Sequence, residues 1–172
     1  MKRSVKLLMA LFAAATLAAC STTEPAEETT DTTVQQDDAT NAEAEALARQ
    51  RAAEEAERQR IAALLENTTI YFDFDSDAIR SGDMELLEVH AKHIQATGKK
   101  VVLEGHADER GTPEYNLALG ERRAKSVAQL MRTYGVSASQ IEVISFGEES
   151  PANPGHTEQA WQENRRVEIK YQ

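Results

Sequence analysis

The hydrophobic positions of this chain fall into three regions with different patterns. Residues 7–17 form a short, almost unbroken apolar run that follows a basic segment at residues 2–6. Residues 21–65 contain few large apolar side chains, whereas residues 68–172 place apolar residues at helical and strand spacing. This distribution predicts a targeting leader, a polar connecting region and one small globular domain.

Four short segments of the globular region combine β-branched, aromatic and apolar residues. They lie at residues 70–72, 101–103, 141–146 and 167–171, and their composition predicts strands. Helix-like segments separate the first three strands, and a loop with a short helix from Thr157 precedes the last one. The order β-α-β-α-β, a loop, then β predicts an α+β fold, a two-layer sandwich with the helices on one sheet.

Two longer helices are expected between the strands. The first follows Ser81, a candidate N-cap, and should end at Gly98. The second has Thr112 as N-cap and Pro113 at its first helical position. Their expected buried stripes are Met84, Leu87, Ala91 and Ile94, then Leu117, Ala124, Val127, Met131 and Tyr134. Gly120 inside the second helix costs ~1 kcal/mol relative to alanine, so we expect close packing of helix on sheet there.

The leader ends in Leu-Ala-Ala-Cys at residues 17–20, and Cys20 is the only cysteine of the chain. The apolar run before it is too short for a bilayer, which takes about 20 apolar residues. These four residues resemble the lipobox of bacterial lipoproteins, which implies cleavage before Cys20 and a lipid anchor on it. Because Ser21 and not aspartate follows, that resemblance implies sorting to the outer membrane, facing the periplasm. An ordinary signal peptide with a cysteine near its cleavage site is the alternative.

Residues 20–41 and 42–66 have different compositions. The first segment is dominated by Ser, Thr, Glu, Asp, Pro and Gln; it predicts a disordered tether because it buries too little apolar surface. The second is rich in Ala, Glu, Arg and Gln and predicts a helix. A solvated helix is favoured over a self-associating coiled coil, because the heptad pattern is weak. The expected organisation is a leader at 1–19, these two segments, and a domain at 67–172.

The charge of the chain narrows its partners. The formal net charge is −10, and removal of the three basic leader residues would take it to −13. This acidity argues against nucleic acid or anionic lipid as partner, since either would require a basic face.

Little in the sequence favours a metal site, a cofactor or catalysis. His90 and His93 are three residues apart on a predicted helix, but no third ligand follows at short range. No nucleophile with a base, metal cluster or carboxylate pair is recognisable, so we expect no enzyme. His106 is expected to order its loop, and His156 to lie on the surface.

Two opposed charges mark the candidate site. Asp108 lies in the loop after the second predicted strand, and Arg123 shares a face of the next helix with Asn116 and Leu119. If the loop folds over that face, Asp108 and Arg123 can converge on a zwitterion such as an amino acid. Arginine binds a carboxylate bidentately, and aspartate accepts hydrogen bonds from an ammonium group. The alternative is an internal salt bridge between the two that only fixes the loop.

The block at residues 104–124 resembles the signature of the OmpA-like peptidoglycan-binding domain family. Within it, His-Ala-Asp-Glu-Arg-Gly-Thr-Pro-Glu-Tyr-Asn at 106–116 is similar to the lipoprotein branch of that family. Further agreement comes from Tyr-Phe-Asp-Phe-Asp at 71–75, Ser-Phe-Gly at 145–147 and Asn-Arg-Arg at 164–166. The resemblance therefore covers the globular region almost continuously.

The resemblance implies non-covalent binding of meso-diaminopimelate in uncrosslinked peptidoglycan stem peptides. Matched position by position, Asp108 would receive the ligand's ammonium group and Arg123 would hold its carboxylate. The positions that would line the pocket are Asp73, Phe74, Asn116 and Leu119.

The resemblance also implies a lipid-anchored tether between outer membrane and cell wall. This tether would work with the periplasmic propeller protein of the Tol system in envelope integrity and in constriction of the outer membrane at division. An OmpA-like lipoprotein outside the Tol system is the alternative within the family. A peptidoglycan hydrolase would need catalytic groups that we do not recognise, and a flagellar stator subunit would need a retained transmembrane helix.

Overall fold

The computed structural model describes residues 34–172, with side chains from Asn41 onward. The expected leader, the lipidation residue Cys20 and most of the expected tether lie outside the described residues. The chain divides into two units, Met1–Ala44 and Glu45–Gln172, and the architecture below is that of the second unit. Within residues 34–172, no helix is both long enough and apolar enough to cross a bilayer.

Helix α1 runs from Val34 to Glu66. The helix therefore includes residues 34–41. The composition had predicted that these residues belong to a disordered tether. Side chains from Asn41 to Ala63 are exposed, and pairs four residues apart, such as Glu45 with Arg49 at 3.1 Å, stabilise such a helix by a few tenths of a kcal/mol each.

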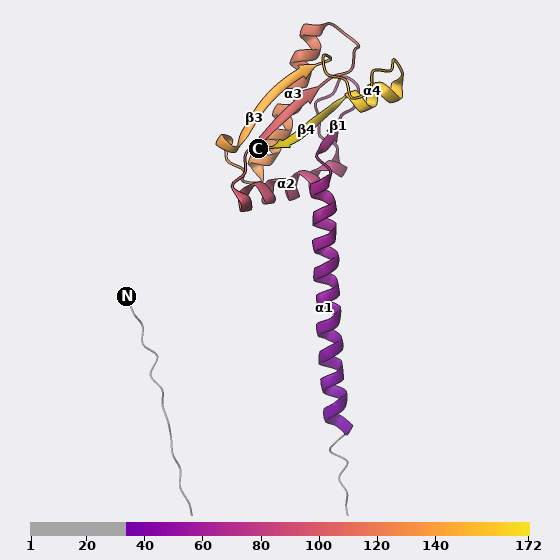
Figure 1. The fold of residues 1–172 in the computed structure, drawn as a ribbon, viewed down its shortest axis with the longest axis vertical. Helices are drawn as coiled ribbons and strands as arrows, with labels where there is room; N and C mark the ends of the chain where they lie inside the picture. Colours follow the sequence, from indigo (N-terminus) through magenta and orange to yellow (C-terminus); the bar gives the residue numbers. More distant parts are fainter. Residues whose placement is uncertain (1–33) are drawn as a thin grey trace, which may run out of the picture. The chain divides into compact units, whose positions relative to one another are not determined.

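Four strands form one mixed sheet in the order β1-β4-β2-β3 (Figure 1). The strands are β1 Thr69–Tyr71, β2 Val101–His106, β3 Ile141–Gly147 and β4 Arg166–Tyr171. β2 and β3 are parallel, while β4 lies between β1 and β2 and is antiparallel to both. The helices are α2 Met84–Thr97, α3 Pro113–Thr133 and α4 Glu158–Asn164, with 3-10 turns at Ser81–Asp83 and Ala138–Gln140. This topology confirms the predicted α+β fold.

The ends of the helices follow the predicted capping residues in most cases. The hydroxyl of Thr112 accepts a hydrogen bond from the Tyr115 amide at 3.2 Å, and Pro113 opens α3. Gly98 closes α2 in the left-handed conformation with φ of 68°. The prediction for Ser81 is wrong, because it begins a 3-10 turn that leads into α2, and no side chain caps that helix.

The core lies between one face of the sheet and helices α2 and α3. Buried side chains of the two helices pack against Val101, Leu103, Val167 and Ile169 of the strands. The helical contributors are Leu86, Leu87, Ala91, Ile94, Ala124, Val127 and Met131. The opposite face of β4 carries Arg166, Glu168 and Lys170 by strand alternation, which gives the two-layer arrangement.

Two residues of the predicted stripes are exposed. Met84 is the first residue of α2 and precedes the turns that pack on the core. Leu117 shares helical spacing with Ala124, but it lies beside Gly147 at the end of β3. Because glycine has no side chain, it leaves the side chain of Leu117 exposed. Periodicity finds the face of a helix, whereas the extent of the sheet decides how much of that face is covered.

Gly120 lets α3 lie directly on the sheet, as predicted. A β carbon at this position would lie 2.5 Å from the hydroxyl oxygen of Ser145 and 2.8 Å from the carbonyl oxygen of Gly105. The first turns of α3 are therefore held against the ends of β2 and β3. This contact places Asn116, Leu119 and Arg123 beside the loop that follows β2.

Candidate functional site

A pocket of about 230 Å³ opens between the loop after β2, the first turns of α3 and the segment after β1. Its lining residues are Phe74, Asp75, Asp108, Arg110, Gly111, Tyr115, Asn116, Leu119 and Arg123. Five of the six expected ligand-binding residues are among them, and Asp73 is not. The fold thus brings the two expected charged residues to one cavity.

Arg123 is fully buried and ties three segments together. Its Nε donates to the carbonyl of Ser76 at 2.8 Å, and its two terminal nitrogens donate to the carbonyls of His106 at 2.8 Å and Asp73 at 3.1 Å. Burial lowers the pKa of Arg123 to about 10, so the guanidinium is still positive at neutral pH. This side chain therefore both lines the pocket and holds its walls.

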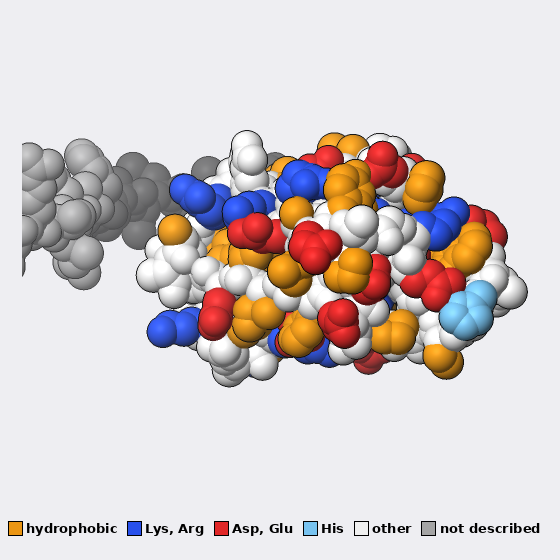
Figure 2. Space-filling model, turned by 90° about the horizontal axis from the view of Figure 1, so that it is seen from above, with side chains coloured by type: hydrophobic (Ala, Val, Ile, Leu, Met, Phe, Trp, Pro, Cys, Tyr) orange, Lys and Arg blue, Asp and Glu red, His pale blue; other side chains and the backbone are white. Residues whose placement is uncertain are grey.

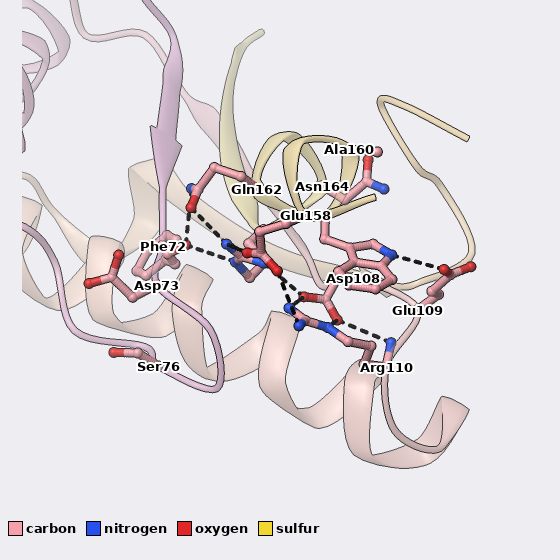
Figure 3. Close-up of polar contacts among 12 residues, drawn as sticks. Phe72, Asp73, Ser76, Asp108, Glu109, Arg110, Glu158, Ala160, Gln162 and Asn164 are labelled. Carbon is pink, nitrogen blue, oxygen red and sulfur yellow. Dashed lines mark hydrogen bonds and ion pairs between the residues drawn. The ribbon is translucent and has the colours of Figure 1, made fainter. Parts of the chain in front are cut away.

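Asp108 is only 4% exposed and is surrounded by arginines. Its carboxylate accepts two side-chain hydrogen bonds from Arg110, at 2.6 and 3.2 Å, and one from Arg165 at 3.1 Å (Figure 3). Burial by itself raises the pKa of Asp108, but the hydrogen bonds from these arginines hold it below its ordinary value. Asp108 thus forms ion pairs with Arg110 and Arg165. The alternative prediction, an internal salt bridge between Asp108 and Arg123, is not what the structure has.

The two arginines on Asp108 differ in how firmly they are held. Arg165 is 3% exposed and also donates to the carbonyl of Phe72 at 3.2 Å, to Glu158 at 2.9 Å and to Gln162 at 2.7 Å. Arg110 is 30% exposed and lies between two aromatic rings. Its guanidinium carbon is 4.0 Å from the ring centre of Phe74 and 4.3 Å from that of Trp161.

Asp73 acts through its backbone, which corrects the expectation that its side chain lines the pocket. Its carboxylate pairs with Arg80 at 2.8 Å, while its carbonyl accepts from Arg123. Phe74, the next residue, does line the pocket and is 58% exposed. The chain turns here, and Asp75 has a left-handed φ of 51°; Phe74 and Asp75 line the pocket, and Asp73 does not.

Asn116 and Leu119 form the buried floor of the pocket on α3. The amide of Asn116 donates to the carboxylate of Glu148 in the loop after β3. At the rim, the hydroxyl of Tyr115 donates to Asp75. The sequence analysis did not identify Asp75, Arg110, Gly111 and Tyr115 as lining residues, although all four lie in segments whose sequence resembles the family.

Two of the histidines, His90 and His106, are buried in the described part of the chain. His106 is buried and stacks on Phe146, with ring centres 5.4 Å apart, and neither of its ring nitrogens has a partner among the described residues. It therefore packs at the end of β2 and does not order the loop by hydrogen bonds. Burial, together with the charge of Arg166, lowers its pKa to about 4. His90 bonds to the hydroxyl of Tyr171 at 2.6 Å and to the carbonyl of Asn67 at 2.9 Å.

The surface charge is mixed on the face seen in Figure 2, where acidic, basic and apolar side chains alternate. This face offers no continuous basic track of the kind that binds the phosphates of nucleic acid. The exposed His156 bonds to Glu109, which also accepts from Trp161 at 2.8 Å. These contacts connect the β2–α3 loop to α4.

In a comparison with known sequences, residues 71–165 match the OmpA family. A protein of Pseudomonas aeruginosa called peptidoglycan-associated lipoprotein is 54% identical over 109 residues, which are 63% of this chain and 65% of that relative. The protein of the same name from Pasteurella multocida is 48% identical over 104 residues, 60% of this chain and 69% of the relative. The match thus spans just under two thirds of the Pseudomonas relative.

Solved structures agree with this match. The crystal structure of the peptidoglycan-associated lipoprotein from Burkholderia pseudomallei superposes with a TM-score of 0.62 at 40% identity, over 63% of this chain and 93% of that one. The C-terminal domain of Helicobacter pylori MotB superposes with a TM-score of 0.56 at 28% identity, over 60% and 83% of the two chains. None of these names denotes an enzyme.

Proposed function

Because this chain belongs to the OmpA family, we propose that it binds uncrosslinked peptidoglycan stems through meso-diaminopimelate and does not cleave them. The observation that carries this proposal is one pocket lined by both a buried carboxylate, Asp108, and a buried guanidinium, Arg123. Each keeps its charge at neutral pH, because the pKa of Asp108 is lowered and that of Arg123 is about 10. Opposite charges in one cavity suit a ligand carbon that bears both an ammonium group and a carboxylate.

The carboxylate of the ligand belongs on the side of Arg123. A guanidinium has five N–H groups, and three of those on Arg123 donate to backbone carbonyls. The other two donate to no described residue, and we infer that they bind the carboxylate of the ligand, where a hydrogen bond from a charged donor contributes ~1.5–3 kcal/mol. Asn116 and Leu119 close the floor beneath this position.

The test is binding of the purified protein, kept in detergent, to isolated sacculi in a pulldown. Sacculi with diaminopimelate stems should retain it, and free diaminopimelate should release it. Sacculi with lysine in the stems, and a Glu121→Gln variant on the exposed side of α3, serve as controls. Retention that is equal on both kinds of sacculi and indifferent to diaminopimelate would rule out the proposed ligand.

The wider role that we propose is that of a tether at the outer membrane. Cys20 would carry the lipid and face the periplasm, and α1 would act as a spacer before the domain at residues 67–172. Cys20→Ala should abolish acyl mass and membrane recovery, as intact mass and fractionation would report. A variant that keeps its acyl mass would place the anchor elsewhere.

The proposed protein partner is the propeller protein of the Tol system, in a cycle of wall-bound and partner-bound states. The similarity to proteins called peptidoglycan-associated lipoprotein supports this partner. The second candidate is an OmpA-like lipoprotein outside that system. Copurification with the propeller protein from crosslinked cells distinguishes the two, because only the first candidate predicts it.

A further inference from the structure

The site of the expected ligand ammonium is already filled by a cation of the chain itself. Arg110 places Nη2 2.6 Å and Nε 3.2 Å from the two oxygens of Asp108, and its backbone amide adds a third bond at 3.1 Å. Figure 3 shows these two side chains facing each other, with Glu158 close to Arg110. A ligand ammonium that reaches Asp108 must therefore compete with the guanidinium of Arg110.

Of the two arginines that bind Asp108, only Arg110 is in a position to move away from it when a ligand binds. Arg165 is almost completely buried and is held by a backbone carbonyl and two side chains besides Asp108. Arg110 lines the pocket and is 30% exposed. Besides Asp108, its side chain has one hydrogen-bond partner among the described residues, Glu158 at 3.3 Å. The flanking rings of Phe74 and Trp161 let a flat guanidinium slide between them while its cation–π contacts are kept.

The consequence depends on the charges that the ligand brings. A lone ammonium on Asp108 would crowd three cations, its own and those of Arg110 and Arg165, around one carboxylate. Like charges this close together repel one another, because the partly buried site screens them less than bulk water does. A ligand with a carboxylate beside the ammonium removes this penalty, because the displaced guanidinium gains an anion in the same step.

We propose that Arg110 is a specificity-determining residue. Its ion pair with Asp108 is replaced by a ligand ammonium only when the ligand carries a carboxylate on the same carbon. The inference rests on the proposed function and adds to it a reason for the choice of ligand. Diaminopimelate differs from lysine by that one carboxylate. Arg110 thus selects diaminopimelate stems over lysine stems through competition, in addition to any direct bond from Arg123.

The experiment uses two probes that differ by one carboxylate. Nα-acetyl-lysine amide presents a lone ammonium, and the α-amide of Nα-acetyl-diaminopimelate presents an ammonium with an adjacent carboxylate. Calorimetric titration of the purified protein in detergent should show a clear preference for the second probe. In Arg110→Gln, the lysine probe should bind roughly tenfold or more tightly than in the parent, since the charge-assisted bonds from Arg110 to Asp108 no longer compete, and the preference should shrink.

Two further measurements keep the test decisive. Arg110→Lys retains a cation but loses the paired bonds and the flat stack, so its preference should lie between those of the parent and Arg110→Gln. The Nε–H resonance of Arg110 should move when the parent binds the diaminopimelate probe. Arg132→Gln, in the exposed last turn of α3, is the control and should match the parent.

The outcomes separate the inference from the proposed function. If the parent binds neither probe, the proposed ligand is wrong. If the parent binds the diaminopimelate probe but Arg110→Gln keeps the same ratio of affinities, or weakens both probes equally, then Arg110 only supports the loop and the inference fails.

Discussion

The carbonyl oxygen of Gly120 occupies the space that a side chain on Gly105 would need. A β carbon built on Gly105 would lie 2.0 Å from that oxygen and 3.3 Å from the β carbon of Ala124. Helix α3 therefore lies directly on β2 without an intervening layer of side chains. The loop that carries Asp108 begins two residues after Gly105, so this contact sets the distance between the loop and the pocket floor.

Gly105→Ala is expected to destabilise the fold by about 3 kcal/mol or more, because the obstacle is rigid backbone and overpacking typically costs 1–3 kcal/mol. Gly82→Ala is the matched control, since nothing lies within 4 Å of a β carbon at that position. Urea unfolding would measure both. Equal stability of the two variants would contradict the close contact.

Asp108→Asn should lower the free energy of unfolding at pH 7 by about 3 kcal/mol, because Asp108 is the buried counter-charge of Arg165 and the partner that remains, Glu158, is largely exposed. The pKa of Asp108 is below its ordinary value of 3.8 in the folded protein. Its contribution is therefore present above pH ~4 and is lost as the pH falls through the folded pKa.

The difference in stability between parent and Asp108→Asn should accordingly shrink below pH ~4 in urea titrations. A difference that stays constant from pH 7 to pH 3 would show that the carboxylate charge is not what stabilises the loop.

Arg123→Met should cost at least about 3 kcal/mol of stability as well as binding, because three carbonyl groups lose a charged donor. Arg122→Met, at the exposed neighbouring position, should stay within about 0.5 kcal/mol of the parent. Thermal melts alongside sacculus pulldowns report the two effects separately. Lost binding with an unchanged melting temperature would mean that these hydrogen bonds add little to the fold.

His106→Phe should flatten the dependence of stability on pH. The folded pKa is about 4 against an ordinary 6.5, so the unfolded chain takes up a proton between these values that the folded protein does not. The parent therefore loses stability as the pH falls from 6.5 to 4, and the variant does not lose this share.

Phenylalanine keeps the stack on Phe146, so the variant should fold. Unfolding free energies at pH 8 and pH 5 give the comparison, and the buried His90 contributes to both proteins alike. The same loss of stability in parent and variant would exclude His106 as the source.

The order of strands and helices was accessible from the sequence because its signals are local. Thr112 and Pro113 start α3 and Gly98 ends α2 through contacts within one turn. Strand composition and helical spacing identified the four strands of residues 67–172 and the helices α2 and α3 between them, with boundaries shifted by a few residues. The exposed positions of Met84 and Leu117 could not be predicted, because burial depends on where the sheet ends.

The residue types of the pocket were also visible, since Asp108, Asn116, Leu119 and Arg123 lie within sixteen consecutive residues. Their partners were not. Arg123 donates to carbonyls near residue 75, and Asp108 pairs with Arg165, 57 residues away. Such bonds form only when the segments after β1, after β2 and before β4 meet at one end of the sheet. Sequence spacing alone therefore determined which charges are available, and the tertiary structure decided which of them are already satisfied and which can be exchanged with a ligand.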